Sequence, residues 1–259
     1  MHNSPTFRTR HHVCRHKSGF HYLLGCALVI TINFLCATSI AQNVSNDSIT
    51  ITSLRDPDWK TYKAFLAGMH IFDQKRNLAP KANLRFALMA KVPDNDESSI
   101  TIRIAGEQNW ARVLVEPDHS FTLPTIPEAA LDNADLLLNR KKGIYFWRPL
   151  ILTPGLPAQV RRLGDLRLEC EVRWAIEQDE LPLIMKKVFN LSGGPCQSKQ
   201  IKADFFSAKK ISTITMIDGS RYQQLDTSRI VNESYRYYPL LNDTSWSDDT
   251  LLHFSFLEE

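Results

Sequence analysis

The chain has 259 residues, of which 43% are hydrophobic and 23% are charged, with 31 Lys and Arg against 28 Asp and Glu. This size and composition fit one large or two modest domains with a hydrophobic core, and they exclude global disorder and a protein with many membrane spans. Residues 1–41 contain four basic residues and no acidic one, so the rest of the chain has 27 basic and 28 acidic residues. A nearly neutral body lacks the basic surface that nucleic-acid binding requires.

Residues 1–41 have the layout of a secretory signal peptide. Arg15 and Lys17 belong to a basic flank, an apolar run extends over residues 22–41, and small residues stand at Ser39 and Ala41. This layout predicts export to the periplasm or out of the cell, with cleavage after Ala41. The alternative is an uncleaved anchor in the inner membrane, because about 20 apolar residues can span a bilayer. Contact with a membrane is expected only in that second case.

Export determines how the five cysteines are interpreted. Cys14, Cys26 and Cys36 fall in the removed segment, so only Cys170 and Cys196 remain. In an oxidising compartment two cysteines most simply form one structural disulfide bond. A redox or metal-binding pair is the alternative, but the Cys-x-x-Cys spacing typical of such pairs is missing.

The rest of the chain divides into a polar lead-in, residues 42–55, and a folded region, residues 56–259. The folded region is one compact body or two closely packed halves, 56–157 and 158–259. A helix is predicted to open at Asp56-Pro57-Asp58, because an Asp cap followed by Pro and a second Asp favours a helix N-terminus. One face of this helix is an aromatic stripe, which comprises Trp59, Tyr62, Phe65, Leu66, Met69 and Phe72. We expect this stripe to pack on a sheet, and the alternative is a platform for a ligand.

Beyond this helix, hydrophobic residues alternate with a period of two. Short alternating runs between residues 84 and 123, separated by turn clusters, indicate antiparallel strands. The run Leu166–Ile176 alternates as well, with charged residues on its other side, and predicts a long strand with one solvated face. A charged helix is the alternative for this run.

Toward the C-terminus, a short helix is expected near residues 180–191, where Gly193-Gly194 ends it. The Asp218-Gly219 pair predicts a hairpin between residues 211–217 and 221–225. The expected fold class is therefore α+β, mainly antiparallel β and sandwich-like, with an N-terminal amphipathic helix and a short helix near 180–191.

Two resemblances narrow the class of protein. Residues Val115–Pro124, read as strand, turn and strand, are similar to the closing hairpin of carboxypeptidase-regulatory-like (transthyretin-like) β-sandwich modules, which usually have Gly where this chain has His119. Residues 58–259 resemble uncharacterised exported proteins of Gram-negative bacteria, through the stretches Asn133–Gly143 and Arg162–Cys170. The resemblances imply a β-sandwich module and an address in the envelope, and they imply no activity.

No motif of a common enzyme class occurs in the chain. It contains no Gly-x-Ser-x-Gly elbow, no His-Glu-x-x-His, no phosphate loop and no dinucleotide-binding glycine motif. Beyond the leader there are only three histidines, His70, His119 and His253, which we interpret as structural residues. We therefore predict no catalytic, cofactor-binding or metal-binding residues and no cofactor.

Acidic residues leave two weaker hypotheses open. The turns at residues 94–97 and 242–249 offer oxygen ligands for calcium, but they lack the Gly and the distal Glu of the known calcium loop, so solvated turn acids are expected. Glu169 and Glu171 would form a carboxylate pair of the glycosidase kind if they met in space. Charges that alternate along a strand are more typical of a solvated sheet surface.

These observations favour an exported, non-catalytic protein that binds a protein or another envelope component. The alternative is a periplasmic hydrolase that uses scattered carboxylates. The two hypotheses differ in one structural feature, because a hydrolase requires at least three polar side chains that converge in one deep pocket.

Overall fold

The computed structural model describes residues 56–91, 94, 98–106, 110–126, 133–191, 193–231 and 233–258. The expected signal peptide, its cleavage site at Ala41 and the polar lead-in lie outside the described residues. Residues from Ile51 to Glu259 belong to one compact unit.

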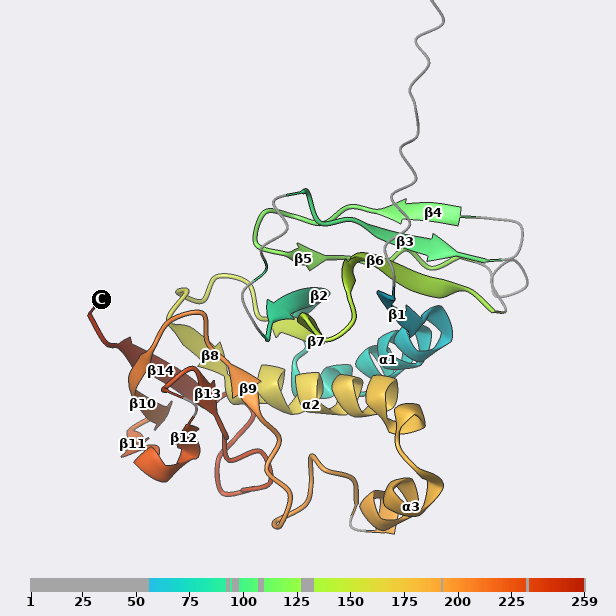
Figure 1. The fold of residues 1–259 in the computed structure, drawn as a ribbon. Helices are drawn as coiled ribbons and strands as arrows, with labels where there is room; N and C mark the ends of the chain where they lie inside the picture. Colours follow the sequence, from blue (N-terminus) through green and yellow to red (C-terminus); the bar gives the residue numbers. More distant parts are fainter. Residues whose placement is uncertain are drawn as a thin grey trace, which may run out of the picture. The chain divides into compact units, whose positions relative to one another are not determined.

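The fold consists mainly of antiparallel β-sheets with a few helices, which is the α+β class (Figure 1). The first half of this unit contributes two sheets. One has the strand order β1-β6-β3-β4, formed by β1 (Pro57–Thr61), β6 (Asp135–Lys141), β3 (Ile102–Ala105) and β4 (Trp110–Val113). The other has the order β5-β2-β7, formed by β5 (Ser120–Phe121), β2 (Asn83–Ala90) and β7 (Tyr145–Leu152).

The second half contributes two more sheets. One has the order β11-β10-β14-β8, formed by β11 (Arg221–Gln224), β10 (Ile211–Asp218), β14 (Leu251–Phe256) and β8 (Val160–Arg162). The other has the order β12-β13-β9, formed by β12 (Ile230–Val231), β13 (Arg236–Tyr237) and β9 (Phe205–Phe206). The helices are α1 (Tyr62–Gln74), α2 (Leu163–Glu177) and α3 (Leu183–Leu191), with short 3₁₀ turns η1 (Arg76–Leu78), η3 (Gln178–Glu180) and η4 (Thr227–Arg229).

The predicted helix start at Asp56-Pro57-Asp58 is wrong. Residues 57–61 form the edge strand β1, which pairs antiparallel with β6, and α1 begins only at Tyr62. An edge strand tolerates Pro57, whose missing N–H removes no ladder bond that a central strand would need. Asp58 is buried and accepts a hydrogen bond from the indole Nε1 of Trp147 at 3.3 Å, so tertiary contacts use this carboxylate in place of a helix cap.

The predicted long strand Leu166–Ile176 is wrong as well, because these residues lie in α2. Its apolar residues form two helical stripes, each with a spacing of four residues, and the stripes are offset by two positions. Leu168, Val172 and Ile176 join one hydrophobic cluster, while Leu166 and Cys170 join another. Two such stripes on different sides of a helix reproduce a strand's period of two, so the alternation in the sequence came from burial on both sides.

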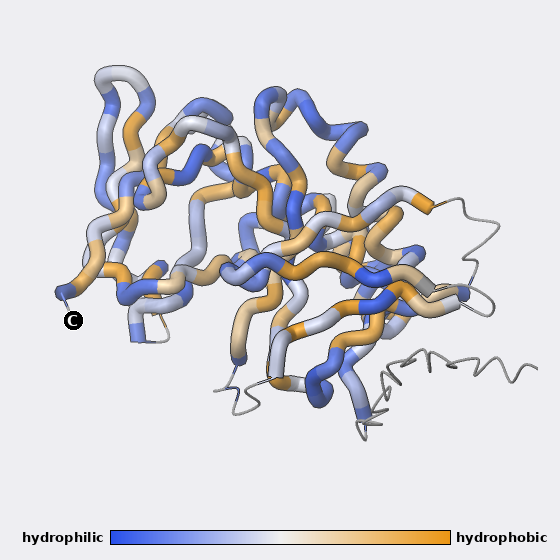
Figure 2. Tube along the Cα trace, turned by 90° about the horizontal axis from the view of Figure 1, so that it is seen from above, coloured by the Kyte–Doolittle hydropathy of each residue, from blue (hydrophilic) through white to orange (hydrophobic). Residues whose placement is uncertain are grey.

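The two hydrophobic clusters lie on either side of α2. The first takes residues from α1 and from both sheets of the first half, and the second takes residues from the β11-β10-β14-β8 sheet and its surroundings. In Figure 1, α2 runs below the strands of the first half and has the strands of the second half beside its N-terminal end. Because α2 contributes residues to both clusters, the helix is shared by both cores. Figure 2 shows that apolar and polar residues alternate along much of the trace.

Two glycines allow close approach to α2. A Cβ added to Gly68 of α1 would lie 2.7 Å from the Ile176 side chain, so the two helices touch where Gly68 has no side chain. A Cβ added to Gly164 would lie 2.1 Å from the carbonyl oxygen of Leu78, a backbone atom that cannot move aside. These positions require glycine for space, since neither has a positive φ.

Predictions for the other β elements had mixed outcomes. The hairpin at Asp218-Gly219 is confirmed, with β10 and β11 paired antiparallel around a Gly219 whose φ is 60°. Residues 110–113 and 120–121 do not form one ladder, because β4 pairs with β3 while β5 pairs with β2. The isolated bridge Val115–Phe121 connects the two sides of that turn, where the N–H of Glu116 donates to the carbonyl oxygen of Ser120 at 2.8 Å.

The disulfide prediction is confirmed. Cys170 of α2 and Cys196 have an S–S distance of 2.09 Å and a Cα–Cα distance of 5.8 Å. The bond therefore connects α2 to the segment that follows α3.

We predict that Phe65→Ala lowers the free energy of unfolding by about 3–5 kcal/mol, because the ring is buried and its loss leaves a cavity. Phe65 packs edge-on against Phe86 and Trp147, at centroid distances of 4.9 and 5.8 Å. Chemical denaturation measures the change. Tyr222→Ala, at a side chain that is 79% exposed, is the control and should change little. Equal effects of the two variants would contradict the burial of the α1 stripe.

We predict that reduction of Cys170–Cys196 lowers the unfolding free energy by about 3–4 kcal/mol, since the bond restricts the unfolded chain. Denaturation with and without reductant measures this, and Cys170→Ser with Cys196→Ser tests it without reductant. Two free thiols that react with an alkylating reagent in native, unreduced protein would refute the bond.

Candidate functional site

A cavity of about 460 Å³ opens between β2, β7, α2 and the segment around β9. Six charged side chains from five parts of the chain converge on it, and we call it the arginine pocket. They are Asp118, Arg148, Arg161, Glu169, Arg173 and Asp204.

Regular secondary structure positions these side chains. In β7 the residues alternate between the core and the opposite face, so Trp147 is buried in the first cluster while Arg148 points to the pocket. In α2, Glu169 and Arg173 stand four residues apart and share one helix face. Asp165 and Glu177 continue the same spacing, which makes a polar stripe that runs between the two apolar stripes.

Each carboxylate of the pocket has a partner in the protein: Asp118 accepts from the N–H and the Oγ of Ser120, and the other two are paired with arginine. Arg161 Nη2 donates to Glu169 Oε2 at 2.6 Å, and Arg173 Nη1 donates to Asp204 Oδ1 at 2.7 Å. Behind the pocket, Glu177 accepts from Arg148 Nη1 at 2.6 Å and from Arg173 Nε at 3.0 Å. The carboxylates are thus already engaged with donors from the protein.

The arginines keep donors that the protein does not use. The Nε atoms of Arg148 and Arg161 are buried and have no hydrogen-bond acceptor among the described residues, and the same is true of Arg236 Nε. Arg236 lies beside the pocket, with its Nε 3.6 Å from Asp204 Oδ2 and its guanidinium 5.0 Å from the Phe206 ring centroid. A buried donor without an acceptor costs free energy, so this cluster favours an added acceptor.

Burial and neighbouring charges shift the pKa of several groups in the pocket. Burial, and then the charge of Arg173, lower the pKa of Arg148 below its ordinary value. Burial opposes the charge of Arg161, but Glu169 and other acids outweigh it and raise the Arg161 pKa, so this guanidinium stays charged. Burial raises the pKa of Glu169 despite the adjacent Arg161. The three arginines that line the pocket are balanced by Asp118, Glu169 and Asp204, so the preference for an anion rests on the unused Nε–H groups and not on an excess of positive charge.

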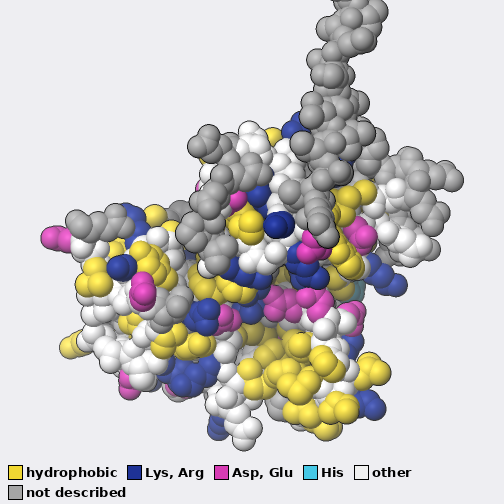
Figure 3. Space-filling model, in the orientation of Figure 1, with side chains coloured by type: hydrophobic (Ala, Val, Ile, Leu, Met, Phe, Trp, Pro, Cys, Tyr) yellow, Lys and Arg dark blue, Asp and Glu magenta, His cyan; other side chains and the backbone are white. Residues whose placement is uncertain are grey.

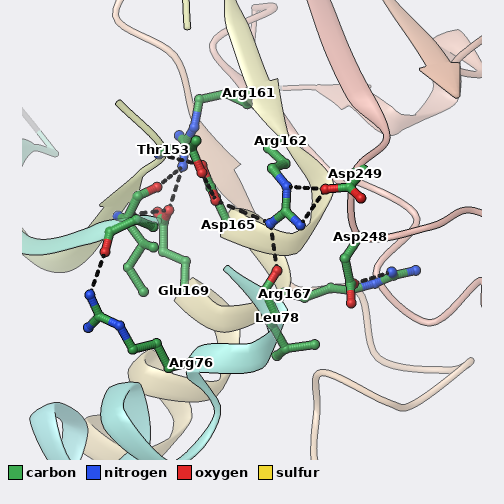
Figure 4. A network of polar contacts seen from close by, with 12 residues as sticks. Arg76, Leu78, Thr153, Arg161, Arg162, Asp165, Arg167, Glu169, Asp248 and Asp249 are labelled. Atoms are coloured by element: carbon green, nitrogen blue, oxygen red, sulfur yellow. Dashed lines mark hydrogen bonds and ion pairs between the residues drawn. The ribbon is translucent and has the colours of Figure 1, made fainter. Parts of the chain in front are cut away.

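The polar stripe ends in a closed structural network at the N-terminus of α2 (Figure 4). Asp165 is 1% exposed and accepts from the backbone N and the Oγ1 of Thr153, at 2.8 and 2.7 Å. Arg162 donates to the carbonyl oxygen of Leu78 and to Asp249, and Arg167 donates to Asp248 at 2.6 Å. These contacts connect α2 to both halves of the fold. Of the polar stripe, Glu169 and Arg173 are the residues that line the arginine pocket.

A second hollow of about 570 Å³ adjoins the pocket and shares Arg161 and residues 206–208 with it. Its lining is richer in apolar rings, which are Phe206, Tyr237, Phe254 and Phe256. Phe146 and Phe206 lie near the same cations, since the guanidinium of Arg148 is 4.5 Å from the Phe146 centroid. Apolar surface thus lies directly beside the positive charge.

Several residues singled out in the sequence lie outside this site. Glu169 lines the pocket, but Glu171 points elsewhere and pairs with Lys75 at 2.7 Å, because residues two apart on a helix diverge. The carboxylate pair proposed for these two residues is therefore wrong. The Cys170–Cys196 bond lies in the second cluster, away from the lining of the pocket.

The histidines and acidic turns also serve other contacts. His70 contacts Gln74 on α1, His119 has a φ of 61° in the turn before β5, and His253 lies in β14. Asp94 pairs with Arg140 at 2.6 Å, and Asp248 and Asp249 pair with arginines of the α2 network. The described residues include no group of three or more His, Cys, Asp or Glu side chains arranged to hold a metal ion.

Comparison with protein-family models, with curated proteins and with solved structures found no match. Within the described part of the chain, no helix is long and apolar enough to cross a membrane. Sequence reasoning missed Arg148, Arg161 and Arg173. The available signal was the spacing of four residues through Asp165, Glu169, Arg173 and Glu177, which the strand interpretation of Leu166–Ile176 concealed.

Proposed function

We propose that this protein is an exported, non-catalytic binding protein that takes a small anionic ligand, a carboxylate or a phosphate, in the arginine pocket. One observation carries the proposal: Arg148 and Arg161 line one cavity, and each holds a buried Nε–H without an acceptor among the described residues. An anionic oxygen placed there would accept these hydrogen bonds and reduce the repulsion between Arg148 and Arg173.

The ligand that fits best has an apolar portion beside its anionic group. Leu150 and Phe206 line the pocket itself, and the adjoining hollow presents Phe254 and Phe256. Pockets that combine apolar walls with a few fixed polar groups are typical of sites for small organic molecules.

The location and scaffold in this proposal rest on the sequence. The basic flank and apolar run of the leader favour export to the periplasm, and the resemblance to exported Gram-negative proteins agrees with that. A sandwich-like arrangement of the β1-β6-β3-β4 and β5-β2-β7 sheets is part of the proposal, because both sheets contribute side chains to the first cluster.

We predict that Arg148→Gln weakens binding of hexanoate about tenfold or more, since the variant removes a charged donor. The fold should survive, because Glu177 keeps its ion pair with Arg173. Isothermal titration calorimetry measures the affinities, with hexanamide as the neutral ligand and inorganic phosphate as an anion without an apolar chain. Hexanamide should bind more weakly than hexanoate.

The matched control is Arg103→Gln, at an exposed arginine of β3 outside the pocket, which should leave hexanoate binding unchanged. Arg148→Lys keeps the charge without the fork of donors and should lie between the parent and Arg148→Gln. Equal affinity of the parent, Arg103→Gln and Arg148→Gln proteins for both anions would refute an anion site at Arg148.

A hydrolase is the second candidate, favoured by the convergence of six charged side chains in one pocket. The raised pKa of Glu169 would suit a general acid. Against this reading, Glu169 and Asp204 are paired with arginine, Asp118 accepts two hydrogen bonds from Ser120, and the unused groups are donors. Hydrolysis of chromogenic esters or glycosides that Glu169→Gln abolishes, while the variant still binds hexanoate, would favour the hydrolase.

A further inference from the structure

Helix α3 presents a row of exposed apolar side chains, and none of its described residues is buried. The exposed fractions range from 45 to 89% for Leu183, Ile184, Met185, Val188 and Leu191. Figure 3 shows the resulting hydrophobic patch in the lower right, where Figure 1 has α3. Ile184, Val188 and Leu191 follow the spacing of one helix face.

The helix is held in place with this face outward. Phe189 packs against Trp174 of α2 at a centroid distance of 5.3 Å, and the N–H of Gly194 donates to the carbonyl oxygen of Phe189 at 2.8 Å. Lys186 pairs with Asp179, and the disulfide bond at Cys196 follows shortly after the helix. A soluble monomer rarely exposes apolar side chains this close together without a partner for them.

The charge around α3 indicates the kind of partner. Residues 178–202 contain four lysines and two acids, and each acid is already paired with a lysine: Asp179 with Lys186, and Glu180 with Lys60. Helix α3 itself contains two lysines, Lys186 and Lys187, and no acidic residue, so the helix complements a negative surface.

Charge also disfavours a second copy of this chain as the partner. Lys187 is exposed and is the middle residue of α3, Leu183–Leu191. In an antiparallel pair of α3 helices related by a two-fold axis, the two Lys187 side chains would approach each other. Their repulsion would oppose the contact.

We propose that α3 docks on an anionic lipid surface, with its apolar face among the acyl chains and its lysines at the head groups. Short amphipathic helices with lysines beside an aliphatic face bind membrane interfaces in this way. This docking depends only on α3, so it stands whether the leader is cleaved or retained and whether the arginine pocket binds an anion.

The test uses the full chain with vesicles of phosphatidylethanolamine and phosphatidylglycerol. Hydrogen exchange followed on the peptide that contains α3 reports this helix separately from the leader, and flotation measures total binding. We expect the α3 amides to gain protection with these vesicles and not with vesicles of phosphatidylcholine alone. High salt should reduce the protection, because exposed charges are screened.

The triple variant Ile184→Ser, Val188→Ser, Leu191→Ser should lose the protection, and Lys187→Glu should weaken it about fivefold or more. Leu114→Ser, at a side chain that is 76% exposed elsewhere, is the matched control and should behave as the parent. All of these positions are exposed, so melting temperatures should stay close to that of the parent.

The proposal is overturned if α3 gains no protection with anionic vesicles, or if the triple variant is protected as well as the parent. A dimer of the parent in light scattering that the triple variant abolishes, without vesicle protection of α3, would assign this face to a second copy. Protection that is equal on neutral and anionic vesicles would contradict the role of the lysines.

Discussion

The burial of α2 on two sides is the constraint on which the rest of this structure depends. One side packs Leu168, Val172 and Ile176 against α1 and the sheets of the first half, and the other packs Leu166 and Cys170 against the second half. Hydrophobic burial is the main favourable contribution to folding, and here one helix serves two cores. Loss of α2 would therefore disrupt both halves together, which agrees with one compact unit.

A helix buried on both sides has its polar residues confined to a narrow strip between neighbouring elements. Buried charges are costly unless they are paired and hydrogen-bonded, and α2 meets this condition by different means along its length. At its N-terminal end, Asp165 is paired with Thr153, which directly follows β7, and with Arg162, which directly precedes α2. Near its middle, Glu169 and Arg173 face a cavity, where Arg148 and Arg161 arrive from two different strands.

Our proposal of binding in place of catalysis rests on the state of the polar groups in this cavity. A catalytic carboxylate must be free to give or take a proton or to attack a substrate, whereas Glu169 and Asp204 are already engaged by guanidinium groups. The buried side-chain atoms that lack a hydrogen-bond partner in the described part of the chain are the Nε–H groups of Arg148, Arg161 and Arg236, which are all donors. Convergence of polar groups alone does not distinguish a binding protein from an enzyme. We base the distinction on the atoms without a partner, which here are hydrogen-bond donors and not carboxylate oxygens.

The sequence by itself determined the elements whose signals are local. Asp218-Gly219 specifies the β10–β11 hairpin through its backbone geometry, and Gly193-Gly194 follows the end of α3. The two cysteines beyond the leader were enough to predict the disulfide bond. The tertiary structure alone decided that residues 57–61 pair with β6 and that Leu166–Ile176 is helical. It also alone assembled the arginine pocket, because Arg148, Arg161 and Arg173 come from three elements. In each case burial against distant residues outweighed the local pattern. In a helix that is buried on two sides, apolar residues can recur every two positions, as they do in a strand.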